Sequence, residues 1–304
     1  SGMQAIVSGV QQILFRQAEI VVAGGTENMS RAPIYLRNSR FGEGNPYLVD
    51  SNLENGQQPI EIYGPNLGMG ITAENVAERF KISREEQDLF ALQSQQKAAE
   101  AIRTGKFIEE IVPIEVKQKK ESFLFDKDEF PRPDTTLSGL QNLRPVFKEN
   151  GTVTAGNSCG RNDGAAALVL MTEQNAKALS LKPMARIVDW ATAGVSPGIM
   201  GIGPVPAIEK LLQRTKKRLE DIGLIELNEA FAAQAVAVIK EAKLDPSKVN
   251  VNGGAIALGH PIGATGARIV TTLVHEMRRQ NISLGIATLC VGGGQGMAIM
   301  LELV

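Results

Sequence analysis

The chain has 304 residues, a mass of 32.6 kDa and a formal net charge of −1, with 43% hydrophobic and 21% charged residues. This balance is typical of a folded globular protein, and the near-zero charge predicts no binding of nucleic acid or of an anionic membrane surface. Two cysteines and two histidines, without the spacing of metal ligands, predict no metal site and favour the reducing cytoplasm. No apolar run is long enough to span a membrane.

The N-terminal part begins directly with a helix. Apolar residues at helical spacing predict this helix over about 2–17, and a short buried strand over 19–23 follows. Residues 37–67 are rich in glycine, proline and asparagine and are predicted to be loop. A capping box at 83–86 predicts the start of a long helix that ends near residue 105. The charged stretch 117–129 is predicted to be a solvated surface.

From residue 164 onward, predicted strands and helices alternate. Strands are predicted over 164–171, 184–195, 222–227, 249–251, 284–290 and 296–303, and helices over 206–215, 230–241 and 264–280. This alternation predicts a sheet covered by helices. Residues 184–304 thus form a complete unit, whereas the residues before them hold only the end of a similar one. We therefore expect the chain to be truncated at its N-terminus.

The segment 252–266 carries the first candidate catalytic residue. It contains five glycines and a proline around His260, a density that brings backbone close to a ligand. A predicted helix begins just after His260, and the positive end of a helix disfavours the imidazolium form. Neutral imidazole can act as a base or stabilise an oxyanion. His275 lies mid-helix among charged residues and is predicted to be an ordinary surface side chain.

Two further segments point to chemistry at strand ends. Cys290 ends a predicted strand and precedes glycines 292–294, which can combine a thiolate with the backbone donors of an oxyanion hole. An inert buried thiol is the alternative. Asn228 lies where a predicted strand turns into a helix, the place where α/β sheets carry ligand groups. Its amide can orient a water or polarise a carbonyl, and capping of the following helix is the plainer interpretation.

Taken together, these segments resemble those of the thiolases, and the resemblance extends along essentially all of the 304 residues. The shared motifs are residues 24–30 (Gly-Gly-Thr-Glu-Asn-Met-Ser), 72–75 (Thr-Ala-Glu-Asn), 154–157 (Thr-Ala-Gly-Asn), 162–165 (Asn-Asp-Gly-Ala), 228–231 (Asn-Glu-Ala-Phe), 259–261 (Gly-His-Pro) and 290–294 (Cys-Val-Gly-Gly-Gly). The resemblance implies an α/β fold of two similar mixed five-stranded halves in αβαβα layers, with a loop domain inserted in the first half.

This fold assigns the chain to three parts. We expect 1–30 and 161–183 to be the remnant of an incomplete N-terminal half, and 184–304 to be the C-terminal half. Residues 31–160 would be the inserted loop domain, which carries substrate, CoA and oligomer contacts.

The resemblance also implies roles for four residues. His260 matches the residue that activates the nucleophilic cysteine and, with Asn228 through a bound water, stabilises the thioester enolate. Cys290 matches the acid/base that moves the α-proton of acetyl-CoA and protonates the leaving thiolate. Gly292 matches the backbone donor of the second oxyanion hole.

The nucleophile itself is expected before residue 1. In the thiolases it lies two residues before a Ser-Gly pair that opens a helix, and this chain begins with Ser1-Gly2. Cys159 and Cys290 occupy other matched positions, so neither is expected to replace it. We expect the 304 residues alone to form no acyl-enzyme.

Four residues are expected at the substrate. Cys159 stands where the family commonly has a serine that binds the pantetheine arm of CoA, and Ser158 is available to compensate for the weaker thiol donor. Arg132 matches a position beside the CoA nucleotide. Met69 matches the short-acyl pocket, although Gly68 replaces the histidine usual in the acetoacetyl-specific type.

The leading hypothesis is the acetyl-CoA C-acetyltransferase type, with acetyl-CoA, acetoacetyl-CoA and CoA as substrates, no further cofactor and no metal. A cytoplasmic homodimer or homotetramer is expected. The alternatives are a 3-ketoacyl-CoA thiolase of broader range in fatty-acid degradation and a non-catalytic CoA-binding relative. A ketoacyl-synthase would carry histidine at position 290, and residues 68–70 lack the frame of a dinucleotide-binding motif.

Overall fold

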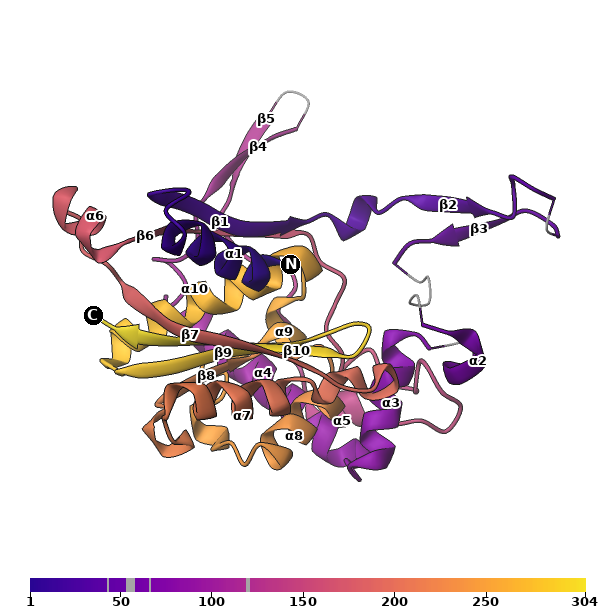
Figure 1. The fold of residues 1–304 in the computed structure, drawn as a ribbon. Helices are drawn as coiled ribbons and strands as arrows, with labels where there is room; N and C mark the ends of the chain where they lie inside the picture. Colours follow the sequence, from indigo (N-terminus) through magenta and orange to yellow (C-terminus); the bar gives the residue numbers. More distant parts are fainter. Residues whose placement is uncertain (43, 53–57, 66, 119–120) are drawn as a thin grey trace.

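The computed structural model describes residues 1–42, 44–52, 58–65, 67–118 and 121–304. Its uppermost layer in Figure 1 is an antiparallel pair of β1 (Ile20–Glu27) and β6 (Gly164–Met171), which lies over the helices α1 (Gly2–Leu14) and α10 (Ile262–Gln280). Helix α1 ends earlier than predicted because Arg16 adopts a left-handed conformation with φ 59°. These four elements enclose one side of the core.

The central layer is a four-stranded sheet in the order β7-β10-β9-β8. Its strands are β7 (Ala185–Gly194), β8 (Leu224–Leu227), β9 (Leu284–Val291) and β10 (Gln295–Leu303). Strand β10 is antiparallel to both neighbours, whereas β8 and β9 run parallel. The sheet is therefore mixed, as the resemblance implies, and its parallel pair brings two strand ends to one edge.

Alternating side chains of this sheet supply two cores. Ile299 on β10 packs with Met3 and Ile269 of the α1 and α10 layer, whereas its neighbour Met300 packs toward the helices on the opposite face. Those helices are α7 (Pro204–Thr215) and α8 (Ala232–Glu241), which lie below the sheet in Figure 1. Period-two alternation along a strand thus fixes which helices cover each face.

A fifth strand expected over 249–251 is absent from the described sheets. Only Val249 pairs, through a single parallel bridge to Ile225. The next residue, Asn250, has a φ of 45°, and this left-handed conformation turns the chain out of the extended path. The amide of Asn250 still bonds to both backbone groups of Leu227, so it fastens the strand end without extending the sheet.

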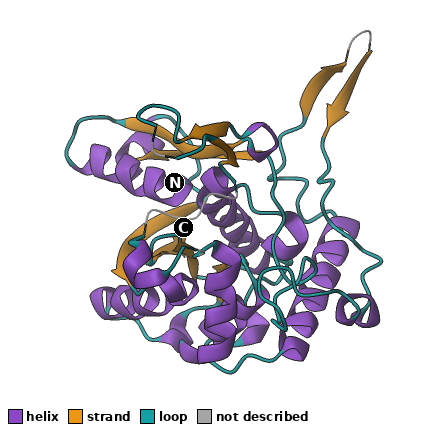
Figure 2. Ribbon diagram, turned by 90° about the vertical axis from the view of Figure 1, so that its right-hand side faces the viewer, coloured by secondary structure: helices purple, strands orange, loops and turns teal. Residues whose placement is uncertain are grey.

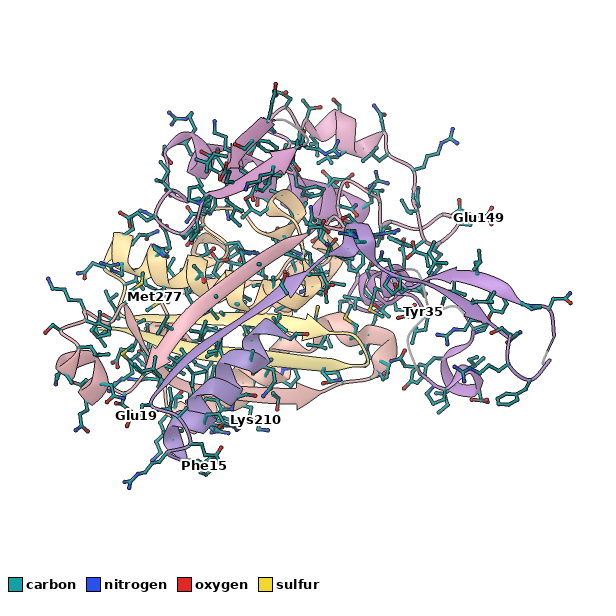
Figure 3. The ribbon with its side chains drawn as sticks, turned by 90° about the horizontal axis from the view of Figure 1, so that it is seen from above. Phe15, Glu19, Tyr35, Glu149, Lys210 and Met277 are labelled. Atoms are coloured by element: carbon teal, nitrogen blue, oxygen red, sulfur yellow. The ribbon has the colours of Figure 1, made fainter. Side chains whose placement is uncertain are left out.

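Residues 31–160 contain two hairpins where loop and solvated surface were predicted. Strands β2 (Ile34–Arg37) and β3 (Tyr47–Asp50) pair within residues expected to be largely loop, and β4 (Ile114–Gln118) pairs with β5 (Glu121–Phe125). Both hairpins project away from the layers (Figures 1 and 2). Tyr35, labelled in Figure 3, lies on the first of them. Because these strands are short and largely exposed, they lack the apolar pattern that identifies a strand.

Residues 31–160 also contain helices that pack on the core. The remaining helices are α2 (Ile60–Tyr63), α3 (Met69–Arg79), α4 (Arg84–Arg103), α5 (Leu137–Gln141), α6 (Glu173–Ala178) and α9 (Ala255–Leu258), with short 3₁₀ helices η1 (Met29–Arg31), η2 (Pro197–Ile202), η3 (Leu219–Asp221) and η4 (Pro246–Lys248). The capping box that opens α4 is present, since Glu86 N–H donates to Ser83 Oγ and Ser83 N–H donates to the Glu86 carboxylate. Helices α3 and α4 both contact α8, and α4 also contacts α9. Through these contacts, residues 31–160 pack against α8 and α9.

Candidate active site

The parallel strands β8 and β9 place two predicted site residues at one edge. Leu227 lies opposite Thr288, and Asn228 N–H donates to Thr288 O at 3.0 Å. Cys290 follows two residues later on β9. Because parallel strands end on the same side, Asn228 and Cys290 both lie at the carboxyl edge of the sheet. Open α/β sheets bind ligands at this edge.

The loop between α9 and α10 adds His260 to this edge. Gly259 has a φ of 95°, and a Cβ there would lie 2.5 Å from Asn162 Cγ, so the loop tolerates only glycine. Asn162 Oδ1 in turn accepts a hydrogen bond from His260 N–H at 3.1 Å. The imidazole Nε2 then lies 3.4 Å from Asn228 Nδ2.

His260 is held neutral mainly by burial. Desolvation, with a smaller effect from the positive charge of Arg268, lowers the pKa of His260 to about 4. The predicted neutrality is therefore present, but its largest cause is lost hydration rather than the helix end named from the sequence.

Cys290 rests as a thiol, the protonated form of the thiolate that its segment can combine with an oxyanion hole. It is 9% exposed and pairs with Gly296 of β10, and burial raises the pKa of Cys290 to about 12. The sulfur is therefore protonated at neutral pH. Such a group can deliver a proton, and it becomes a base only when a bound partner stabilises the thiolate.

Met69 lies against the glycine turn that follows Cys290. A Cβ placed on Gly292 would be 3.4 Å from the Met69 sulfur, so the first residue of α3 closes over this backbone. The next two glycines both have a φ of 90° and complete the turn into β10. Gly292 and Met69, predicted from separate motifs, are thus neighbours.

Ser158 and Cys159 are brought beside the same edge. Ala232 N–H donates to Asn157 O, and Cys159 N–H donates to Ala230 O, which aligns this segment with the residues after Asn228. Burial, with a smaller effect from Cys290, raises the pKa of Cys159 to about 12.

Ser158 makes a poor substitute for a pantetheine donor. Its Oγ donates to Thr154 O at 2.7 Å and the side chain is buried. Because a hydroxyl has one hydrogen, this bond leaves Ser158 only acceptor capacity.

Asn228 does not cap the following helix. Helix α8 begins at Ala232 after Phe231, whose side chain makes no capping bond, so the plainer interpretation of Asn228 is wrong. Asn228 is 1% exposed, and its Oδ1 has no hydrogen-bond partner among the residues that the structure describes. A buried acceptor of this kind is completed by water or by a substrate group.

Arg132 is separate from this group in character. It is exposed, and its backbone N–H donates to Gln95 Oε1 at 2.9 Å, which fixes the loop that carries it. The CoA contact expected of its side chain stays a prediction.

Sequence reasoning missed several residues that support the site. Thr265 Oγ1 lies 2.6 Å from His260 Nδ1, and Asn162 holds the backbone of the same loop. The buried carboxylate of Glu229 accepts from Ser94 Oγ, from Asn250 Nδ2 and from Ile256 N–H. Asn162, Glu229 and Thr265 all lie within the glycine-rich or shared motifs, so their positions were visible but their partners were not.

The other histidine departs from its prediction. The side chain of His275 is 14% exposed and lies 3.9 Å from the carboxylate of Glu109. The His275 side chain is therefore half-buried beside Glu109, not on an open surface. Its partner Glu109 is not one of the residues around His260, so the two histidines have different surroundings.

Comparison with known proteins accounts for this geometry. The profile "Thiolase, N-terminal domain" matches residues 1–174, and "Thiolase, C-terminal domain" matches residues 181–303. The chain belongs to the thiolase family. Acetyl-CoA acetyltransferase of Rhizobium meliloti is 52% identical over 304 residues, covering 99% of this chain and 76% of that protein. Acetyl-CoA acetyltransferase of Escherichia coli is 53% identical over 307 residues, with 99% and 77% covered.

Solved structures show the same fold. The Bacillus anthracis acetyl-CoA acetyltransferase superposes with a TM-score of 0.94 at 49% identity and covers 100% of this chain and 77% of its own. Human mitochondrial 3-ketoacyl-CoA thiolase in complex with CoA gives 0.93 at 48%, covering 100% and 76%. None of the described helices is long and apolar enough to cross a membrane. Within the described ranges, no group of three or more metal-ligating side chains is present.

Proposed function

We propose that this chain carries the acyl-transfer site of an enzyme that interconverts two acetyl-CoA with acetoacetyl-CoA and free CoA. The observation that carries the proposal is the convergence of Asn228, His260 and Cys290 at the carboxyl edge of β8 and β9. A binding protein needs none of these three groups. Acyl transfer through a thioester enolate needs a base, a stabilised oxyanion and a proton donor.

The chemistry of each group follows from its surroundings. Neutral His260 accepts the proton of a nucleophilic thiol, because its low pKa keeps a nitrogen lone pair free at neutral pH. The unpartnered Asn228 Oδ1 accepts from a water that the amide orients toward the thioester oxygen. Cys290, a thiol at rest, protonates the enolate carbon in thiolysis and takes that proton back in condensation.

The acetyl-CoA C-acetyltransferase type agrees with the first relatives compared, and Met69 against Gly292 supports a short acyl pocket. Gly68 in place of histidine favours the second candidate, a thiolase of broader 3-ketoacyl-CoA range. Acetoacetyl-CoA and a longer 3-ketoacyl-CoA, assayed side by side, separate the two. Because both cysteines are free thiols, we place the enzyme in the cytoplasm. From its membership of the family, we expect a homodimer or homotetramer. We also propose that the chain has three parts. Residues 1–30 with 161–183 are the remnant of the N-terminal half, residues 31–160 are the inserted loop domain, and residues 184–304 are the C-terminal half.

The proposed site is tested by the exchange of acetyl-CoA methyl protons with D₂O, which requires proton transfer but no acyl-enzyme. We expect deuterium incorporation above buffer, with a loss of about 100-fold in Cys290→Ala and in His260→Asn. The matched control His275→Asn changes the other histidine and should retain the rate. Absence of exchange, or equal exchange in Cys290→Ala, would refute the assignment.

We further infer that the 304 residues by themselves form no acyl-enzyme, because both cysteines are assigned to other roles. The intact mass of denatured, alkylated protein comes first. A mass of 304 residues with two alkylated thiols predicts no thiolysis of acetoacetyl-CoA. A heavier chain with a further thiol predicts thiolysis and a transient acetyl adduct on that thiol. Thiolysis by the 304-residue species would overturn the inference.

A further inference from the structure

Thr265 forms the second hydrogen bond of the His260 ring. Its Oγ1 lies 2.6 Å from His260 Nδ1 and donates to Pro261 O at 2.9 Å, one turn back in α10. Thr265 is 1% exposed, so water does not compete for either bond. The side chain therefore lies between the imidazole and the first carbonyl of the helix.

The direction of these bonds follows from the single hydrogen of the Thr265 hydroxyl. That hydrogen is donated to Pro261 O, which also accepts from the backbone N–H groups of Ala264 and Thr265. The hydroxyl oxygen is then left to accept from Nδ1–H. On the other side of the ring, Asn228 Nδ2 lies 3.4 Å from Nε2 and is a donor, so it meets a lone pair rather than a second hydrogen. In this arrangement each hydrogen bond in the series from Asn228 through His260 and Thr265 to Pro261 O joins one donor to one acceptor.

The opposite arrangement is less favourable. If the hydroxyl donated to Nδ1, Nε2 would carry the hydrogen and would face the Asn228 amide hydrogens. Pro261 O would lose the hydroxyl bond and keep only those from the backbone N–H groups of Ala264 and Thr265. The facing hydrogens of His260 and Asn228 would then be unmatched, and the cost of unmatched buried donors selects the Nδ1–H tautomer.

We propose that Thr265 is a positioning residue that holds His260 in the Nδ1–H tautomer, with the Nε2 lone pair directed at the reacting atoms. The inference rests on the proposed function for what that lone pair does. It extends the site by a hydroxyl that touches no substrate but decides which ring nitrogen is the base. The chemical consequence is a His260 that is ready to take a thiol proton without a prior tautomer change.

The ¹⁵N NMR spectrum of histidine-labelled protein at pH 7.5 tests the tautomer without any substrate. The unprotonated ring nitrogen resonates far downfield of the protonated one, so Nδ1 and Nε2 are distinguished directly. We expect His260 to show a protonated Nδ1 and an unprotonated Nε2. Thr265→Val removes the hydroxyl at nearly constant shape and should give the Nε2–H form or a mixture. Thr265→Ser restores the hydroxyl and should restore the spectrum.

Thr271→Val is the matched control. Thr271 Oγ1 makes the same backward bond on the same helix, to Ala267 O at 3.0 Å. The control therefore loses an equivalent helix contact while the spectrum of His260 is expected to stay unchanged. Wild-type protein with a protonated Nε2, or a Thr265→Val spectrum identical to wild type, would overturn the proposal.

Proton exchange of acetyl-CoA provides a second measurement. Thr265→Val should slow the exchange about tenfold, with recovery in Thr265→Ser and no change in Thr271→Val. Failure of exchange in wild-type protein counts against the proposed function alone, because the tautomer is read in the absence of substrate. Full exchange in Thr265→Val together with a shifted tautomer would refute the positioning role.

Discussion

Burial governs the ionisation of the titratable side chains at the candidate site. It lowers the pKa of His260 to about 4 and raises those of Cys159 and Cys290 to about 12, because each charged form loses hydration. The motif around His260 predicts a neutral imidazole for a different reason. The resting thiol of Cys290 is not predictable from neighbouring glycines, since desolvation comes from strands and helices distant in sequence.

Glu110 provides a pH-dependent test at the same scale. Burial raises the pKa of Glu110 to about 7, and its Oε2 is buried without a hydrogen-bond partner in the described part of the chain. The folded-state pKa of Glu110 lies above its unfolded value, so the protonated carboxyl contributes to the stability of the fold. That contribution is complete below pH 4.5 and is lost as the pH rises through about 7. Glu110→Gln should therefore stabilise the protein by about 2 kcal/mol at pH 8 and by little near pH 4.5.

Urea unfolding at the two pH values measures this difference. The neighbouring Glu109 is 80% exposed, so Glu109→Gln is the control and should show no comparable pH dependence. An equal effect of Glu110→Gln at both pH values would contradict the assigned burial of its carboxylate.

The regular elements follow local sequence closely where a helix or strand is apolar on one side. Strand β6 has the predicted bounds, and α4 begins at the predicted capping box. The exposed hairpins within 34–50 and 114–125 could not be predicted from local sequence. Their strands are held by pairing with each other rather than by an apolar face. The bridge at Val249 likewise depends on the conformation of Asn250, which no periodicity reveals.

The contact between β1 and the start of α10 decides how the His260 loop is supported. A Cβ on Gly25 would lie 2.0 Å from Gly263 O, and Gly263 N–H donates to the Glu27 carboxylate at 3.0 Å. Gly25→Ala should therefore separate the two elements and destabilise the fold by about 3 kcal/mol. Thermal and urea unfolding measure the loss.

Gly194→Ala is the matched substitution. Gly194 also lies in a strand, β7, and a Cβ there has nothing within 4 Å. It should leave stability unchanged or raise it slightly, because alanine narrows the unfolded ensemble. Equal destabilisation by both substitutions would show that strand propensity, and not the contact with α10, sets the effect.

At the scale of the whole molecule, the β1–β6 pair covers α1 and α10 on one side and is open on the other (Figure 1). Val22 and Val169 face each other across the pair and are 72% and 60% exposed. Exposed apolar side chains on an open strand pair favour association. The double substitution Val22→Thr with Val169→Thr keeps β-branched side chains and should weaken self-association of the 304-residue polypeptide in sedimentation velocity.

The control changes two exposed valines outside this pair. Val112 and Val304 are 80% and 61% exposed, so their replacement by threonine removes similar apolar surface. The control should sediment like the unmodified chain. Unchanged sedimentation of the Val22→Thr and Val169→Thr variant would show that the open face is not an association surface.

The sequence by itself determined the class of fold and the family, and it predicted the residues at the centre of the candidate site, because motifs and periodicities are local. Asn228, His260 and Cys290 each lie in a short segment whose composition marks it. Only the tertiary structure decided that Thr265 faces the His260 ring, that Met69 lies on Gly292 and that Cys290 rests as a thiol. Hydrogen-bond partners and desolvation arise between segments far apart in the chain, and packing alone brings those segments together.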